Sequence, residues 1–170
     1  TTDLGVYTVC EVIDKRLLKR VYPTADADGN LYKVRYTNEG PANFKKTGAV
    51  IKSGSQYSAI SGGKIGIENL GASYHPSYDL KTNTIAPNYS DIANLIGNID
   101  SSSDYDSEAN KTMLESRLDM DSFLKMEAVA YFMGNPDDFR NNYNNLYLYF
   151  VPSTGKAVFI PYDFDRAFGM

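Results

Sequence analysis

Residues 121–165 read DSFLKMEAVAYFMGNPDDFRNNYNNLYLYFVPSTGKAVFIPYDFD, and this stretch decides how we expect the chain to fold. The apolar residues of its first part cover most of the circumference of a helix over residues 122–133, a pattern that predicts burial on nearly all sides. Asp121 is a suitable N-cap for that helix, and Gly134 suits the left-handed position that follows a helix C-terminus. The stretch therefore begins with a predicted buried helix that ends at Met133.

The remainder of the stretch predicts a loop and a β-hairpin. The loop, residues 135–144, is rich in Asn and Asp and contains a proline that blocks continuation of the helix. Two apolar, Tyr-containing runs follow at 146–151 and 157–161, separated by a turn at 152–155. This spacing predicts two antiparallel strands joined by a short turn.

Upstream of residue 121 the sequence predicts strands first and helices later. Strands are expected at 5–13, 31–36 and 78–81, and helices at 15–20 with Asp14 as N-cap, from Ser90 to the polar linker 101–106, and at 108–118. Residues 37–77 carry Gly-rich punctuation and predict a loop with one or two short elements. This order favours an α+β fold over alternating βαβ units. We expect one domain over 1–170, β-rich over 1–89 and helical, with the hairpin, over 90–170.

The composition argues against several classes of function. The net charge of the 170 residues is −4, whereas a general nucleic-acid binder carries a basic surface. No apolar run approaches the roughly 20 residues that a membrane-spanning helix needs. One cysteine and one histidine, Cys10 and His75, are too few for an internal disulfide or for a Cys- or His-based zinc site. We therefore expect no nucleic-acid partner and no membrane span in this segment.

Carboxylate and amide side chains concentrate after the predicted buried helix and around the predicted hairpin. Phosphoryl transfer uses an aspartate that orients or deprotonates the acceptor hydroxyl, and oxygen ligands that hold magnesium. Protein kinases carry the base, the Asn ligand and the metal-binding Asp in this order, with a hairpin between the last two. Asp and Asn also favour loops and helix caps, so their spacing alone leaves both interpretations open. The residues concerned are Asp137, Asp138, Asn142, Asn145, Asp163 and Asp165.

Three segments together resemble the signature of the CotH (spore coat protein H) kinase-like family. Residues 134–139 (GNPDDF), 144–149 (NNLYLY) and 159–169 (FIPYDFDRAFG) are similar to the family's G-N-x-D, N-N-Y-Y-L-Y and I-P-W-D-x-D-x-x-F-G. Weaker similarities run upstream in the family's order from Gly5, so the resemblance covers nearly the whole chain. Tyr162 stands where the family has Trp, which keeps the flanking aspartate but changes the shape of the aromatic group.

The resemblance implies an atypical, reduced protein-kinase-like fold that binds ATP and Mg²⁺. Asp137 corresponds to the catalytic aspartate, with its neighbour Asp138 as the alternative. Asn145 corresponds to a magnesium ligand. Asn142 competes with Asn145 because it follows Asp137 by five residues, which is the protein-kinase spacing.

The remaining assignments also follow from the resemblance. Asp163 corresponds to the metal-binding aspartate, and Asp165 supports it. Lys33, in a predicted strand, corresponds to the lysine that pairs with the phosphates, and Lys81 is the alternative. Glu11 is expected to form an ion pair with one of these two lysines.

Two functions remain open at this point. The first is an ATP- and Mg²⁺-dependent phosphotransferase that phosphorylates Ser, Thr or Tyr hydroxyls of a surface or exported protein. The second is a non-catalytic, kinase-like surface module in which the aspartates serve as caps. The resemblance places the protein outside the cell or at its envelope. It also implies a partial domain, because strands before Thr1 and helices after Met170 would complete a kinase-like fold.

Overall fold

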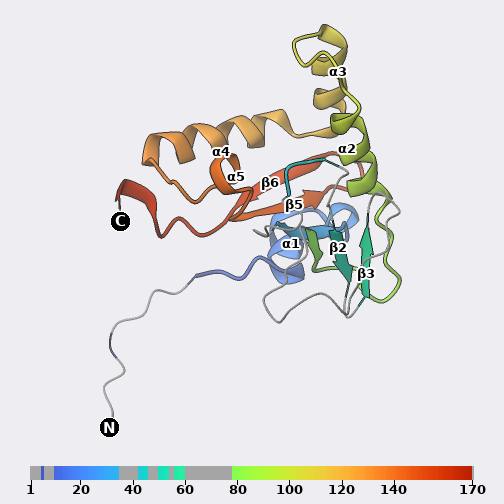
Figure 1. Cartoon of the computed structure of the whole chain (residues 1–170). Coiled ribbons are helices and arrows are strands. Elements are labelled where there is room, and N and C mark those ends of the chain that lie inside the picture. The colour runs from blue at the N-terminus through green and yellow to red at the C-terminus, as the bar shows by residue number, and fades with distance from the viewer. Residues whose placement is uncertain are drawn as a thin grey trace.

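The computed structural model describes residues 5, 10–34, 42–45, 50–53, 56–59 and 78–169, with the backbone alone for 50–53 and 56–59. Helices and strands alternate irregularly along the chain (Figure 1). The helices are α1 (Lys15–Val21), η1 (Thr24–Asp26), α2 (Ser90–Asp100), α3 (Glu108–Arg117), α4 (Met120–Met133), α5 (Phe139–Asn142) and η3 (Ala167–Gly169). The strands are β1 (Leu31–Val34), β2 (Val50–Ser53), β3 (Gln56–Ala59), β4 (Tyr78–Leu80), β5 (Leu146–Phe150) and β6 (Ala157–Pro161).

The six described strands form one sheet in the order β3-β2-β4-β1-β5-β6. Every neighbouring pair is antiparallel except β2 with β4. β5 lies between β1 and β6 and is buried at all five positions, which explains why LYLYF is apolar or aromatic throughout. Helices combined with a mainly antiparallel sheet correspond to the predicted α+β class.

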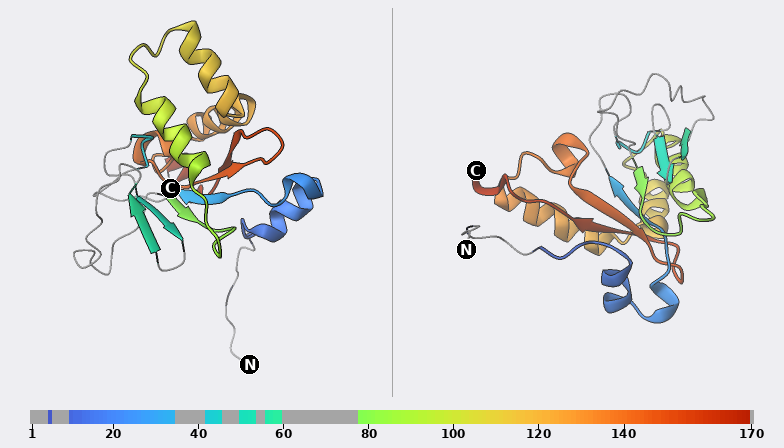
Figure 2. Two further views of the ribbon diagram at one scale, coloured as in Figure 1. Left: turned by 90° about the vertical axis from the view of Figure 1, so that its right-hand side faces the viewer. Right: turned by 90° about the horizontal axis from the view of Figure 1, so that it is seen from below.

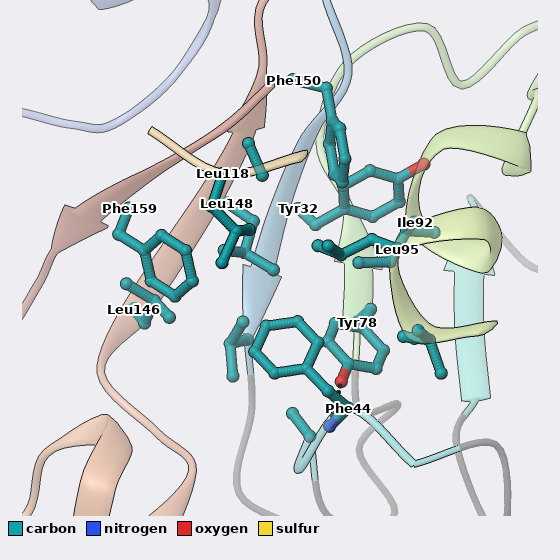
Figure 3. Close-up of a cluster of buried hydrophobic side chains, with 14 of the residues drawn as sticks. Tyr32, Phe44, Tyr78, Ile92, Leu95, Leu118, Leu146, Leu148, Phe150 and Phe159 are labelled. Carbon is teal, nitrogen blue, oxygen red and sulfur yellow. Dashed lines mark hydrogen bonds between the residues drawn. The ribbon is translucent and has the colours of Figure 1, made fainter. Parts of the chain in front are cut away.

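The two faces of the sheet carry different cores. α2 and α4 lie on one face and α1 lies on the other (Figures 1 and 2). The larger core fills the face under α2 and α4, where rings and branched side chains from β1, β4, β5, β6 and α2 interdigitate (Figure 3). The smaller core, under α1, contains Leu18, Leu31, Tyr147, Tyr149 and Val151. Alternation along β5 sends Leu146 and Leu148 to the first core and the two tyrosines to the second.

The start of α4 and its burial both differ from the prediction. The N-cap is Asp119, whose carboxylate accepts from the Ser122 N–H at 3.0 Å, whereas Asp121 pairs with Lys125 in solvent. Of the α4 side chains, Met126 and Ala130 are buried, but Tyr131 and Phe132 are 75% and 83% exposed. α4 packs on β6 and also contacts η3. An apolar sequence on all sides of a helix therefore does not show how many sides another element covers.

Several other predictions are confirmed. Asp14 caps α1 by accepting from the N–H groups of Arg16 and Leu17. Ile92, Leu95 and Ile96 of α2 face the core, and the hairpin strands lie where they were predicted.

The other differences are local. Residues 10–13 belong to no strand, contrary to the predicted strand 5–13, and the predicted loop 135–144 contains the short helix α5. Residues 6–9, 35–36 and most of 37–77 lie outside the described part of the chain. No helix within the described residues is long and apolar enough to cross a bilayer.

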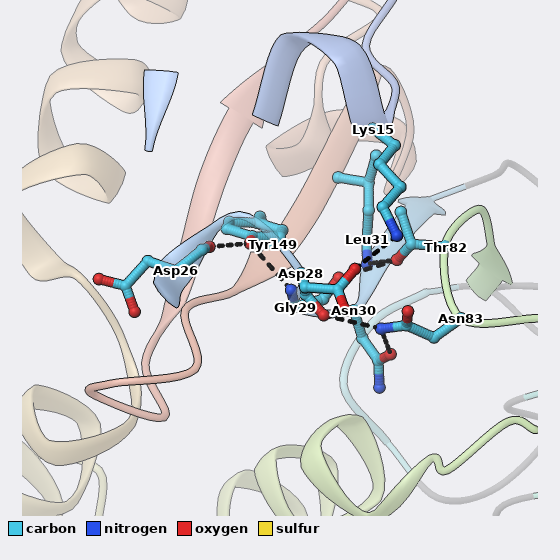
Figure 4. Close-up of polar contacts among 9 residues, drawn as sticks. All are labelled: Lys15, Asp26, Asp28, Gly29, Asn30, Leu31, Thr82, Asn83 and Tyr149. Carbon is cyan, nitrogen blue, oxygen red and sulfur yellow. Dashed lines mark hydrogen bonds and ion pairs between the residues drawn. The ribbon is translucent and has the colours of Figure 1, made fainter. Parts of the chain in front are cut away.

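The end of β5 that leads into the turn to β6 is bonded to the segment after α1 through Tyr149, and we call this the closed end of the hairpin (Figure 4). The Tyr149 hydroxyl accepts from the Gly29 N–H at 3.0 Å and donates to the Asp26 carbonyl. The Thr82 hydroxyl donates to the Gly29 carbonyl at 2.9 Å and accepts from the Leu31 N–H at 2.8 Å. Side-chain oxygens thus satisfy backbone groups that the sheet itself leaves without partners.

Candidate functional site

The opposite end of the hairpin, where β5 begins and β6 ends, holds most of the predicted site residues, and we call it the open end. Leu146 pairs with Pro161 at this edge of the sheet. One residue beyond that pair, the Tyr162 N–H donates to the Asn145 carbonyl at 3.0 Å. This bond places Asp163, which follows Tyr162, close to Asn145. Two residues far apart in the sequence, both predicted to bind metal, therefore meet at one edge.

Asp137 lies at the centre of a cluster of side chains. Asn142 Nδ2 donates to one carboxylate oxygen of Asp137 at 2.8 Å, and Asn145 Nδ2 donates to the other at 3.1 Å. Asn145 Nδ2 also donates to the Asp137 carbonyl at 2.7 Å. Both of the competing predicted metal ligands, Asn142 and Asn145, thus contact the predicted catalytic aspartate.

Asp138 has a different environment from Asp137. Its side chain is 5% exposed, and it is the N-cap of α5, accepting from the Asn141 N–H and Nδ2 at 2.9 Å each. Arg140 Nη2 donates to its second oxygen at 3.0 Å. Both carboxylate oxygens of Asp138, like those of Asp137, therefore accept hydrogen bonds, and the two aspartates differ in burial. Asp137, which is half-buried, is the better placed of the two to meet a ligand.

The buried side chain of Asn135 holds the loop that carries Asp137. Gly134 ends α4 in the left-handed conformation with φ of 61°. Asn135, only 2% exposed, then accepts the Asp137 N–H on its Oδ1 at 3.1 Å. Its Nδ2 and the buried Oε1 of Glu127 have no hydrogen-bond partner among the described residues. The hydrogen bond from the Asp137 N–H to Asn135 therefore fixes the backbone of the loop. The other polar atom of the Asn135 amide and the Glu127 oxygen contribute no hydrogen bond within the described residues.

Glu127 of α4 lies near the same loop. Burial raises the pKa of its carboxyl, the neighbouring Asp138 carboxylate raises the pKa further, and Arg140 opposes both effects. A buried carboxyl favours its neutral form because charge is poorly solvated there. Glu127 is therefore a titratable group close to the loop that the sequence did not single out.

Three non-glycine residues around the open end adopt left-handed backbone conformations. Tyr143, Asn145 and Asp163 have φ of 51°, 56° and 57°. Such conformations are uncommon outside glycine, although Asn and Asp tolerate them better than other residues. Strained residues that gather at one place are typical of sites where side chains must be aimed in a fixed direction.

Lys33 approaches the open end from β1. Its register partners are Tyr147 on β5 and Asp79 on β4. Its Nζ lies 4.2 Å from the centre of the Tyr162 ring and 5.5 Å from that of Tyr147. The predicted phosphate-pairing lysine is therefore in contact with the residue that directly precedes Asp163.

Lys81, the alternative to Lys33, is bound to a carboxylate. Its Nζ lies 2.5 Å from Asp79 Oδ2, and the Asp79 side chain is almost completely buried. Because Asp79 and Lys33 face each other across the sheet, both lysines lie on the same side of β4 and β1.

Glu11 is not part of this arrangement. It pairs with Arg20 of α1 at 2.5 Å, and both side chains are exposed. The prediction that Glu11 pairs with Lys33 or Lys81 is therefore wrong. With residues 10–13 outside the sheet, Glu11 lies beside α1 instead of along the strands, and Asp79 is the carboxylate that binds Lys81.

The donor atoms at the open end are compatible with magnesium. Among the described residues no three His, Cys, Asp or Glu side chains converge on a point, so a cage built only from such residues is not present in that part of the chain. Mg²⁺ usually takes one or two carboxylates together with substrate phosphates and water. Asn142 and Asn145 donate hydrogen bonds to Asp137 through their amide nitrogens, so their amide oxygens could serve as metal ligands. Asp163 and Asp165 are exposed.

The sequence of the chain also matches a protein-family model. The family model described as CotH kinase protein matches residues 1–170, the whole chain. The chain therefore belongs to the CotH kinase family. No curated protein matches it.

The sequence did not indicate the two aromatic rings that contact the Lys33 ammonium. Tyr147 and Tyr162 meet edge to face with ring centres 5.5 Å apart, and both rings face the Lys33 ammonium. The Tyr-rich strand β5 was visible in the sequence. The strand register that places Tyr147 opposite Lys33 was not, because register depends on pairing between distant segments.

Proposed function

We propose that this chain transfers the γ-phosphoryl group of ATP to a hydroxyl group, with Mg²⁺ as cofactor, on an atypical kinase-like scaffold. The observation that supports this most strongly is that Asn142 and Asn145 both bind the Asp137 carboxylate at the open end of the hairpin, where the residue before Asp163 binds the Asn145 carbonyl. A lysine at 4.2 Å from the ring next to Asp163 completes the set. Membership of the CotH kinase family supports the same class of reaction.

Each residue has a role in this reaction. Asp137 accepts a hydrogen bond from the acceptor hydroxyl and takes its proton as the hydroxyl oxygen bonds to the γ-phosphorus. The bond between the γ-phosphorus and the β,γ-bridging oxygen breaks, and ADP leaves with that oxygen. Lys33 binds phosphate oxygens through its ammonium group. Asn142 and Asn145 hold the Asp137 carboxylate in one orientation, which lowers the entropy lost on reaching the reactive geometry.

The metal ligands in this proposal are Asp163, Asn145 and Asn142, with Asp165 in support. Bound Mg²⁺ would neutralise charge on the phosphates, which is its usual contribution to phosphoryl transfer. Asn145 and Asp163 both have left-handed backbone conformations, and they lie where β5 begins and where β6 ends, at the same end of these neighbouring strands.

The acceptor in this proposal is a Ser, Thr or Tyr hydroxyl of a surface or exported protein. The chain's family supports a protein substrate, and an exported location is carried over from the resemblance alone. The open end lies at an edge of the sheet, where Asp163 and Asp165 are exposed. A side chain of another protein can reach such an edge more readily than an enclosed pocket.

Calorimetry of Mg²⁺-dependent ATP binding tests the proposal. We expect binding by the wild-type chain that requires Mg²⁺ and is lost in Asp163→Ala, because the variant lacks a carboxylate that bridges metal and phosphates. Asp106→Ala is the matched control, since Asp106 is exposed in the connection between α2 and α3 and lies away from the site. The control should bind as the wild type does.

The same titration contains the result that contradicts the proposal. Absence of ATP binding by the wild-type chain, with and without Mg²⁺, would favour the non-catalytic surface module. Equal binding by wild type and Asp163→Ala would remove Asp163 from the metal site. Thermal unfolding of each variant shows whether a loss of binding comes from a loss of folding.

A further inference from the structure

Tyr162 contacts three different members of the proposed site. Its backbone N–H donates to the Asn145 carbonyl at 3.0 Å, its ring lies 4.2 Å from the Lys33 ammonium, and its carbonyl carbon is bonded to Asp163. The Tyr147 ring supports it from the side at 5.5 Å. One half-buried aromatic residue therefore joins the predicted metal ligands to the predicted phosphate-binding lysine.

Such an arrangement restricts the motion of the Lys33 side chain. Lysine has four rotatable bonds, and fixing them costs conformational entropy each time the ammonium meets a ligand. An aromatic face attracts an ammonium group within about 6 Å of its centre through the ring quadrupole. The contact orients the ammonium without using the hydrogen-bond donors that a phosphate would need.

We propose that Tyr162 is a positioning residue that holds the Lys33 ammonium over its ring and beside Asp163, so that lysine and metal site bind the same nucleotide phosphates. This inference rests on the proposed function for its consequence in ATP binding. The ring, and not the hydroxyl, carries the effect. The ring of Tyr147, on the neighbouring strand, contacts both the Lys33 ammonium and the Tyr162 ring.

The first experiment measures Mg²⁺-dependent ATP affinity in ring variants. Tyr162→Leu should weaken binding about tenfold, the loss expected when a partly desolvated ammonium–ring contact is removed. Tyr162→Phe keeps the ring and should bind within about twofold of the wild type on the same grounds. Tyr105→Leu, at an exposed tyrosine between α2 and α3, is the matched control and should bind unchanged.

A double-mutant cycle tests whether Tyr162 acts through Lys33. Lys33→Met removes the charge and leaves the ring in place, so Tyr162→Leu should cause no further loss of affinity in that background. Independent, multiplying losses from the two substitutions would overturn the proposal. So would Tyr162→Phe losing as much affinity as Tyr162→Leu, because the ring is unchanged in that variant.

A measurement without nucleotide separates this inference from the proposed function. NMR of the full chain should show the Lys33 ε-methylene protons shifted upfield by the ring, and Tyr162→Phe should keep that shift. A wild-type spectrum without the shift overturns the positioning role even if Tyr162→Leu fails to fold. A wild-type chain that shows the shift but binds no ATP would contradict the proposed function. It would still support the contact in which Tyr162 positions the Lys33 ammonium.

Discussion

The two ends of the β5–β6 hairpin use polar side chains in different ways. At the closed end, Tyr149 and Thr82 bind backbone groups of Asp26, Gly29 and Leu31 (Figure 4). At the open end, Asn142 and Asn145 donate to the carboxylate of Asp137, and Asn145 also donates to the Asp137 carbonyl. Polar side chains that satisfy backbone groups stabilise a fold, whereas polar side chains that orient one another prepare a surface for a ligand.

Backbone conformation strengthens this contrast. At the closed end the left-handed residues are Gly155, for which the conformation costs little, and Asn83, which follows Thr82. At the open end the left-handed residues are Tyr143, Asn145 and Asp163, which carry side chains and bear the cost of that conformation. The comparison teaches that the mere presence of polar side chains does not separate a structural site from a functional one. The partners and the backbone do.

The largest expected effect is on phosphoryl transfer and comes from Asp137→Asn. The variant should transfer γ-phosphate about a thousandfold more slowly, because a neutral amide cannot take the proton. ATP binding should be retained, since the metal ligands are intact. Radiolabelled transfer from ATP to a generic acceptor such as casein measures the rate.

Asp138→Ala is the companion variant at the same loop. Removing the buried N-cap of α5 should lower the free energy of unfolding by about 2 kcal/mol. Transfer by the protein that remains folded should fall much less than in Asp137→Asn. If Asp138→Ala abolishes transfer while Asp137→Asn does not, the assignment of the two aspartates is reversed.

The next effect concerns stability at the closed end. A Cβ on Gly29 would stand 2.0 Å from the Phe150 carbonyl oxygen, so the backbone must move. We expect Gly29→Ala to lower the free energy of unfolding by about 3 kcal/mol, as measured by urea denaturation. Gly155→Ala is the control, because its φ is 65° but no atom lies within 4 Å of the added Cβ. It should cost about 1 kcal/mol, and equal costs would show that the close approach at Gly29 relaxes freely.

The smallest effect is a pH dependence beneath the open end. The folded protein raises the pKa of Glu127 above its ordinary value of 4.5, so ionisation of this carboxyl opposes folding. That penalty is absent below the ordinary value and grows as the pH rises toward the folded-state pKa. Glu127→Gln should therefore gain stability relative to the wild type as the pH rises above 4.5. The exposed Glu115→Gln should show no such trend, and a matching trend in both variants would rule out burial as the cause.

The local signals in the sequence predicted much of the fold. Caps and periodicity located α1, α2, α3 and the hairpin, because these features depend on residues a few positions apart. The burial of α4 was overpredicted, since Leu124, Val129, Tyr131 and Phe132 remain exposed. Burial depends on what packs against a helix, and no local pattern contains that information.

The candidate site was predictable in part. The order of Asp137, Asn145 and Asp163 along the chain suggested that they act together, and the hairpin brings them to one edge. The separation of Asp137 from Asp138 was not predictable, because it depends on α5, a short helix hidden in a polar loop. The wrong partner for Glu11 has the same origin, since it depends on the position of a segment that lies outside the sheet.

The left-handed backbone at Asn145 and Asp163 limits the mutations that these positions can accept. Glycine, asparagine and aspartate enter this conformation at low cost, and every other residue adds strain. Of these three residue types, asparagine and aspartate have a side-chain oxygen. The backbone conformation alone therefore favours three residue types at both positions. Among them, only a substitution to glycine removes the side-chain oxygen with little strain. Drift under selection for a stable fold would tend to preserve oxygen donors at these positions, even in descendants that no longer use them.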